Sequence, residues 1–230
     1  MPQLSNEFVS HFGVKLRYDS PVYSDFMKER IRTGAYEVQE ATELERIIQE
    51  GETVLELGAG IGFVTCVIAK NALVKKVISY EANPDLIPII IETLENNDIE
   101  ASKYEIRNGV VAVKPRTSQV DFYVHEHFWA SSLAPIQGCK KMVKINVDDF
   151  NRVLVDLKPS MIVCDIEGGE LELFKKATLT GVKKVYIETH QRQLGRRGMK
   201  SLFERFHELD FHYDQHHSKA GVVLFSHIDR

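Results

Sequence analysis

The sequence predicts an α/β fold in which helices cover both faces of a doubly wound, mostly parallel sheet of the Rossmann-like type. Strand-like and helix-like segments alternate from Thr53 onward, which is typical of a parallel sheet. Several of the strand-like segments have apolar stretches, such as "MIVC" at 161–164, as expected for strands that are buried on both faces. A glycine-rich turn, "GAGIG" at 58–62, joins the first of these strands to the first helix of the alternating region.

Each expected element follows from its own residue pattern. A helix at 41–51 has Leu44 and Ile48 at helical spacing and Gly51 as its expected C-cap. A helix at 83–97 has Asn83 as its expected N-cap. Residues 109–150 are expected to form a β-rich insertion with a short helix at 148–157, and the chain is expected to close with an antiparallel strand pair at 211–227. The other expected strands are 53–57, 75–81, 103–108, 161–165 and 183–190, and the other expected helices are 63–73, 169–177 and 199–209.

Length and composition predict one domain, 1–230, made of an N-terminal helical cap (1–50) and a core (51–230). The formal net charge of -4 excludes a global attraction to polyanions, so we expect neither a nucleic acid nor a membrane partner. The first residues lack the pattern of a signal peptide, and the longest aliphatic run, "LIPIII", is too short to span a bilayer. Cys66, Cys139 and Cys164 have no metal-ligand spacing and are expected to be buried thiols of a cytoplasmic protein.

The glycine-rich turn predicts a nucleotide-type cofactor, because it follows a strand, opens a helix and is followed about 20 residues later by Glu81 at the next strand end. A dinucleotide fingerprint would have its third glycine where Phe63 stands. Glu56, two residues before the first glycine, would repel a pyrophosphate but attract the sulfonium and ammonium groups of S-adenosylmethionine. S-adenosylmethionine is therefore the predicted cofactor and NAD the alternative.

Several motifs occur together in one order: "VLELGAGIGF", "YEANPDL", "NGVVAV", "FWASSL", "INVDDF", "CDIEGGE" and "IETH". With "GAYE" at 34–37, they resemble the FkbM family of S-adenosylmethionine-dependent methyltransferases over about residues 34–190. The resemblance implies O-methylation of a hydroxyl group on a small molecule, such as a sugar or a secondary metabolite. The loop and these motifs together indicate the expected cofactor-binding residues: Glu37, Glu56, Gly58, Ala59, Gly60, Gly62, Phe63, Glu81, Ala82, Asn83, Asn108, Gly109 and Asp165.

The acidic turn "DIEGG" ends the strand at 161–165, and "IETH" ends the next strand. Asp165 and Glu167 are two residues apart, as are Glu188 and His190, so each pair is expected to point to one side. Because ligands bind at the carboxyl ends of strands where the strand order reverses, these four residues are the expected catalytic group, for substrate positioning or as base. Helix capping by the two acids at 165 and 167 is the structural alternative. The residues leave open whether the carboxylates hold Mg²⁺, and no metal ligand is assigned.

Weaker signals lie outside these motifs. His125 and His127 share a strand face, which indicates either a metal pair or a solvated strand. Trp129 and Ser131 or Ser132 are expected either to line the acceptor pocket or to pack in a loop. The segment 192–200, with Arg192, Arg196, Arg197 and Lys200, reads either as a solvated face or as a site for an anionic sugar or phosphate. The alternative functions are an NAD-dependent oxidoreductase, a nucleic-acid methyltransferase, which the acidic pI and the "DIEGG" turn oppose, and a non-catalytic cofactor-binding protein.

Overall fold

The computed structural model describes residues 8–18, 20, 22–125, 127 and 130–229. Its strands are β1 (Phe8–His11), β2 (Val14–Arg17), β3 (Glu52–Leu57), β4 (Val74–Glu81), β5 (Tyr104–Ala112), β6 (Gln119–His125), β7 (Cys139–Asp149), β8 (Met161–Cys164), β9 (Lys184–Glu188), β10 (Phe211–Lys219) and β11 (Val222–His227). Its helices are α1 (Asp25–Arg32), α2 (Val38–Ile47), α3 (Phe63–Lys70), α4 (Ile87–Asn96), α5 (Phe150–Leu157), α6 (Glu170–Phe174) and α7 (Gln191–Glu208), with a 3-10 turn at Ala101–Lys103.

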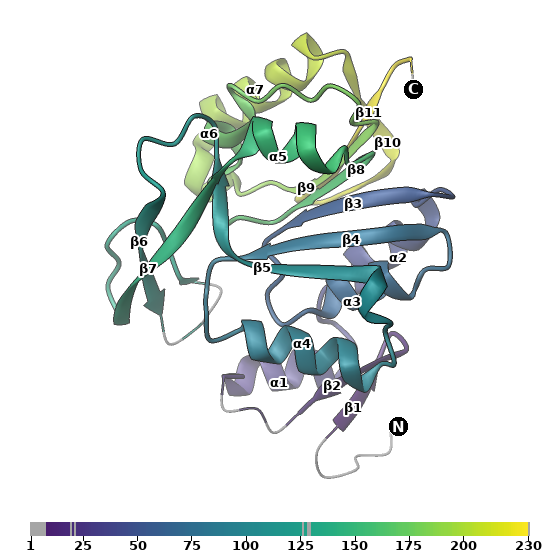
Figure 1. Ribbon diagram of the computed structural model, residues 1–230, viewed down its shortest axis with the longest axis vertical. Coiled ribbons are helices and arrows are strands. Elements are labelled where there is room, and N and C mark those ends of the chain that lie inside the picture. Colours follow the sequence, from purple (N-terminus) through teal and green to yellow (C-terminus); the bar gives the residue numbers. More distant parts are fainter. Residues whose placement is uncertain (1–7, 19, 21, 126, 128–129, 230) are drawn as a thin grey trace.

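One nine-stranded sheet forms the centre of the molecule, in the order β10-β11-β9-β8-β3-β4-β5-β7-β6 (Figure 1). The six strands from β9 to β7 in this order are parallel, whereas β6 and β11 run antiparallel to their neighbours. The predicted fold class, a doubly wound and mostly parallel sheet with antiparallel C-terminal strands, is confirmed. The expected β-rich insertion adds β6 and β7 to the sheet edge, with β7 parallel to β5.

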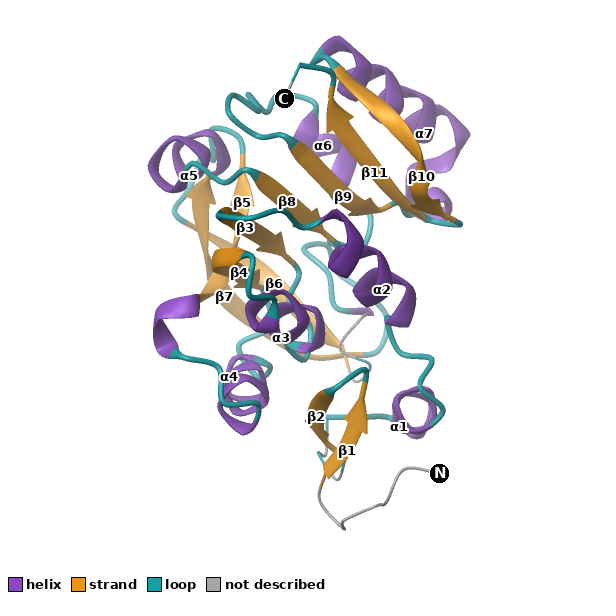
Figure 2. Cartoon of the chain, turned by 90° about the vertical axis from the view of Figure 1, so that its right-hand side faces the viewer, coloured by secondary structure: helices purple, strands orange, loops and turns teal. Residues whose placement is uncertain are grey.

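Helices cover both faces of the sheet because its central strands are apolar on both sides. Helices α2, α3 and α4 lie on one face, and α5, α6 and α7 lie on the other (Figure 2). A hydrophobic core fills each interface: the first includes Phe63 and Ile90, and the second includes Phe174 and Phe206. The sheet is therefore buried between two layers, as its apolar strands predict.

The strand order reverses between β3 and β8. The chain runs outward from β3 through β4 and β5 to β7 and then returns to place β8 on the other side of β3. Because β3 and β8 are parallel, with Leu57 opposite Cys164, their carboxyl ends meet at one edge. This edge is the position where open α/β sheets bind their ligands.

The structure corrects four local predictions. Helix α4 begins at Ile87, because the Asn83 side chain accepts a hydrogen bond from the Asp85 backbone amide (3.1 Å) in a turn and does not cap the helix. Helix α2 ends at Ile47, so Gly51 is not its C-cap. The N-terminal segment is not purely helical, since it includes the β1–β2 hairpin. Cys139 is exposed, whereas the other two cysteines are buried.

Among the described residues, no helix has both the length and the apolar character needed to cross a membrane. The prediction of a single domain stays a prediction.

Candidate active site and cofactor pocket

The glycine-rich loop links three strand ends. The backbone amides of Gly58 and Ala59 donate to the carbonyl of Tyr80 on β4 (2.9 and 3.2 Å). The amide of Asp165, after β8, donates to the carbonyl of Leu57 on β3 (2.9 Å). Gly58 has a φ of +88°, and a Cβ atom there would lie 1.8 Å from the carbonyl oxygen of Asp165. The loop therefore contacts the acidic turn through its backbone, as the sequence predicts from the strand order.

Glu81 is held by the loop that it faces. Its two carboxylate oxygens accept hydrogen bonds from the amides of Gly60 (2.9 Å) and Asn83 (2.7 Å). Burial raises the pKa of Glu81 to about 7, although these amides lower it in part. Asn108 donates from its side chain to the carbonyls of Glu81 (2.9 Å) and Ala82 (3.2 Å), which fixes the chain after β4. Ribose binding by Glu81 stays a prediction.

Glu56 lies at the carboxyl end of β3 and is only 1% exposed. Thr65 donates its hydroxyl to one carboxylate oxygen (2.6 Å), and Ser79 donates to the same oxygen. The other oxygen, Oε1, is buried without a hydrogen-bond partner in the described part of the chain. Burial raises the pKa of Glu56 to about 7, against the hydrogen bonds from Ser79 and Thr65.

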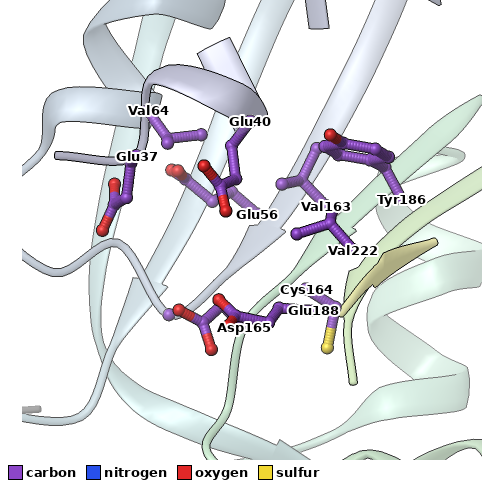
Figure 3. A pocket seen from close by; sticks show the side chains of 11 residues that line it. Glu37, Glu40, Glu56, Val64, Val163, Cys164, Asp165, Tyr186, Glu188 and Val222 are labelled. Atoms are coloured by element: carbon purple, nitrogen blue, oxygen red, sulfur yellow. The ribbon is translucent and has the colours of Figure 1, made fainter. Parts of the chain in front are cut away.

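A small cavity of about 40 Å³ lies against these strand ends, under α2 and α3. Carboxylates from α2, β3 and the ends of β8 and β9 reach it (Figure 3). The acids that line it are Glu37, Glu40, Glu56, Asp165 and Glu188, and none of its described lining residues is basic. Burial raises the pKa of Glu37 well above its usual range, and nearby carboxylates add to this effect. A cavity with this charge suits the ammonium and sulfonium groups of S-adenosylmethionine.

A second group of charges continues from this cavity along the ends of β8 and β9. His190 Nε2 lies 3.3 Å from a carboxylate oxygen of Glu167 and 3.5 Å from one of Asp165. On its other side, Nδ1 lies 2.7 Å from Oε1 of Glu170, whose side chain is fully buried. The four predicted catalytic residues therefore lie at adjacent strand ends, as the sequence predicts.

The charged side chains in this group shift one another's pKa values. Burial, followed by the carboxylates of Glu188 and Glu167, raises the pKa of Asp165 well above its usual range. Burial also raises the pKa of Glu167, although His190 opposes it. Burial alone would lower the pKa of His190, but Glu170 and then Asp165 raise it to about 9. His190 is therefore mostly protonated at neutral pH and suits hydrogen-bond donation better than the proton acceptance expected from its ordinary pKa.

Asp165, Glu188 and His190 could also hold a divalent cation, since one ligand atom from each lies within 4.8 Å of the others. Carboxylate oxygens suit Mg²⁺, and the imidazole suits transition metals better. The sequence-based prediction assigns no metal ligand, and metal dependence stays open.

Some predicted residues serve the fold and not the pocket. Phe63 is fully buried, with its ring 4.6 Å from that of His11, so its side chain packs in the core. A Cβ atom on Gly109 would lie 2.7 Å from the carbonyl oxygen of Asn146, so this glycine permits the close pairing of β5 and β7. His125 ends β6, with its ring 5.5 Å from that of His127 and away from the acidic cavity. Trp129 lies outside the described residues.

Sequence reasoning missed Glu40 as a cavity residue and Glu170 as the partner of His190. Glu40 follows the predicted Glu37 by three residues and could have been found from helical spacing. Glu170 was not predicted as a site residue, because no local pattern shows that it faces a histidine 20 residues later.

A family model described as the TRM5/TYW2 methyltransferase domain matches residues 27–128, somewhat less than half of the 230-residue chain. A protein of Methanosphaera stadtmanae named "Probable ribosomal RNA small subunit methyltransferase A" is 40% identical over 75 residues, which cover 33% of this chain. The matched part spans only 24%, about a quarter, of that relative's length.

Solved structures resemble the whole fold. Trm5b from Pyrococcus abyssi superposes with a TM-score of 0.52 at 13% identity, covering 95% of this chain and 55% of that one. A methyltransferase from Pyrococcus furiosus gives a TM-score of 0.51 at 13% identity, covering 94% and 89%. At these identities the likeness shows the fold alone, which is the Rossmann-like class I methyltransferase fold.

The fold and the matched domain define the class to which this part of the chain belongs: a Rossmann-like domain of the S-adenosylmethionine-dependent methyltransferases. The predicted cofactor is therefore confirmed. The finer prediction of an FkbM-type O-methyltransferase is not supported, because the family model that matches is a different one.

The predicted partners are wrong. A small hydroxylated molecule was expected and nucleic acid excluded, but the matched domain and the relative named for ribosomal RNA both point to a nucleic acid substrate. The physical reason is that net charge is a sum over the whole chain and says nothing about local basic segments.

Proposed function

We propose that this chain is an RNA methyltransferase related to the TRM5/TYW2 proteins and that its substrate is transfer RNA. The observation that carries the proposal is the domain match over residues 27–128, which includes the glycine-rich loop, Glu56 and Glu81. TRM5/TYW2 proteins methylate transfer RNA, and the relative from M. stadtmanae is named for ribosomal RNA. The whole activity, including the RNA species and the methylated atom, belongs to the proposal.

S-adenosylmethionine, when bound, supplies a methyl group on a positively charged sulfur that a nucleophilic atom of the RNA attacks in line. The acids of the cavity would hold the positive groups of the cofactor beside the ends of β8 and β9. Holding the acceptor atom and the methyl group in line lowers the activation barrier of methyl transfer by up to about 7–11 kcal/mol. Substrate positioning at the acidic turn is therefore the main task of this site.

Asp165 and Glu167 are the proposed bases for the proton that the acceptor loses. A carboxylate is a stronger base when its pKa lies above its ordinary acidic value, and burial raises the pKa of both carboxyl groups. His190, with a pKa raised to about 9, places a positive charge 3.3 Å from Glu167 and 3.5 Å from Asp165 and holds these carboxylates by charge. Glu188 completes the negative wall beside Asp165.

Methyl transfer from labelled S-adenosylmethionine to an unmodified tRNA transcript tests the proposal, with a fragment of small-subunit ribosomal RNA as the second substrate. We expect label in the tRNA with the wild-type protein. Asp165→Asn should lower turnover by about 10²–10⁴-fold, because it removes a positioned base, while cofactor affinity changes less. Asp156→Asn on the outer face of α5, where the carboxylate is exposed, is the matched control and should retain full activity.

Two outcomes would count against the proposal. A wild-type protein that binds the cofactor but labels neither RNA contradicts RNA methylation. Label in the ribosomal fragment alone contradicts the choice of tRNA and leaves the class of substrate standing.

A further inference from the structure

Three arginines lie close together at the start of α7 without a partner for their charge. Arg192, Arg196 and Arg197 are exposed, and within the described residues none of them makes an ion pair or a side-chain hydrogen bond. Most other described arginines are neutralised by a carboxylate: Arg17, Arg32, Arg46, Arg107, Arg152 and Arg205 each form an ion pair. The three arginines therefore form a local positive patch on a chain whose net charge is -4.

This arginine patch borders the acidic turn of the active site. Helix α7 starts directly after His190, which is its N-cap residue. Its first turn packs on the acidic turn, where a Cβ atom on Gly168 would lie 2.7 Å from Cβ of Gln193. One turn later α7 contacts α6, since a Cβ atom on Gly198 would lie 3.6 Å from Leu171. The first turns of α7, which carry the patch, thus lie beside the acidic turn and beside α6, which is next to α7 in Figure 1.

A break in α7 separates the patch into two parts. Gly195 has φ 65° and ψ 173°, which are not helical values, so a new helical segment starts after it. Arg196 and Arg197 open this second segment, where the positive end of its helix dipole adds to their charge. Arg192 lies before the break, close to His190. The break at Gly195 therefore separates the charge of Arg192 from the charges of Arg196 and Arg197.

We propose that Arg192, Arg196 and Arg197 bind phosphate groups of the RNA backbone and hold the acceptor nucleotide over the acidic turn. This inference rests on the proposed function, since it takes RNA as the substrate. The planar guanidinium group binds phosphate oxygens through two parallel hydrogen bonds, which lysine does not offer.

Charge explains why such a patch is needed beside this site. The cavity that suits the cationic cofactor is lined by five carboxylates, which repel the phosphates of an approaching RNA. Unpaired arginines at the border of the acidic turn offset that repulsion and place the backbone outside, while an uncharged base can enter. The carboxylates of the cavity thus attract the cationic cofactor, and the arginine patch attracts the RNA backbone.

The salt dependence of RNA binding tests the proposal, because each phosphate contact releases counterions. A labelled, unmodified tRNA transcript is titrated with the wild-type protein and with the triple variant Arg192→Gln, Arg196→Gln, Arg197→Gln at several salt concentrations. Loss of three contacts should lower the slope of log affinity against log salt by about 2 to 3. At the lowest salt concentration the variant should bind the transcript at least about tenfold more weakly.

A matched control removes three positive charges from the opposite edge of the sheet. Lys75, Lys158 and Lys183 lie near the amino ends of β4, β8 and β9, and the triple change of these lysines to glutamine should leave the slope nearly unchanged. A second triple variant with lysine at the three arginine positions keeps the charge. It should recover most of the slope but less of the methylation rate, because the two-pronged phosphate contact is lost. Circular dichroism and cofactor titration show that each variant is folded.

The outcomes separate this inference from the proposed function. If the wild-type protein methylates tRNA and the arginine variant keeps its salt slope, the inference is wrong and the function stands. If the change of Lys75, Lys158 and Lys183 to glutamine lowers the salt slope as much as the change of the three arginines to glutamine, only overall charge matters. That result also overturns the inference. A wild-type protein that does not bind tRNA at low salt overturns both.

Discussion

The two sides of the strand reversal hold their acids in different ways. On the β3–β4 side, hydroxyl groups hold Glu56 and backbone amides hold Glu81, all of them from neighbouring segments of the chain. On the β8–β9 side, Asp165, Glu167 and Glu170 are arranged around His190, and charge is the main link between them. Asp165 Oδ1 is buried with no hydrogen-bond partner among the described residues.

This difference fits a division of work between cofactor and substrate. Hydrogen bonds from hydroxyl groups and backbone amides fix a carboxylate before any ligand arrives, which suits a cofactor site that binds one molecule in one pose. A group of charges that balance one another responds to each added proton or cation, which suits the side where a proton must leave the acceptor.

The largest effect is expected where the two sides meet. Gly58→Ala places a Cβ atom 1.8 Å from the backbone carbonyl of Asp165, and φ is +88°. A backbone atom cannot move aside, so the loop and the acidic turn must separate. We expect a loss of about 3 kcal/mol or more in the free energy of unfolding, and a loss of cofactor binding. Urea denaturation and calorimetry measure the two effects.

Gly51→Ala is the matched control for this change. Its φ of +79° is similar, but nothing lies within 4 Å of the added Cβ atom, so only about 1–2 kcal/mol of backbone strain is expected. Equal losses in both variants would show that strain alone matters and that the close contact of loop and turn does not.

An intermediate effect is expected on the side held by hydrogen bonds. The pKa of Glu56 is raised to about 7, so its carboxyl group is ionised at pH 8 and mostly protonated at pH 5.5. Only the ionised form attracts the cationic cofactor. The wild-type protein should therefore bind S-adenosylmethionine about tenfold more tightly than Glu56→Gln at pH 8, which corresponds to a pKa shift of about one unit on binding. At pH 5.5 the two should bind equally.

Calorimetric titration at both pH values checks this result. Glu204→Gln, which removes a carboxylate from the outer part of α7, should match the wild type at both. A ratio of affinities that does not change with pH would mean that Glu56 does not ionise in the cofactor site.

The smallest effect is expected on the side held by charge. Glu170→Gln keeps the shape of the side chain but removes the charge that raises the pKa of His190. The pKa of His190 should fall from about 9 by about one unit or more, and turnover near pH 8 should fall several-fold because the imidazole no longer stays protonated beside Asp165 and Glu167. An NMR titration of the histidine resonances, assigned with His190→Gln, follows the change directly. An unaltered midpoint would show that Glu170 has only a packing role.

Much of the fold was predictable because its signals are local. Alternating apolar segments and the glycine-rich turn predicted β3, α3, β4 and β8 to within a few residues. The start of α4 was not predicted, because a turn at Asn83 competes with helix capping over the same residues. The β1–β2 hairpin was missed, because four-residue strands carry too little periodicity to be distinguished from irregular chain.

The sequence by itself determined the doubly wound sheet, the cofactor class and the set of strand-end acids, because strand ends in such a fold meet at one edge. Only the tertiary structure decided that Glu37 and Glu40 on α2 join Asp165 and Glu188 in one cavity, and that Glu170 holds His190. Such contacts join residues that are far apart in the chain, and no local pattern records them. The arginines of α7 show the same limit, since their exposure and lack of carboxylate partners depend on how the whole chain packs.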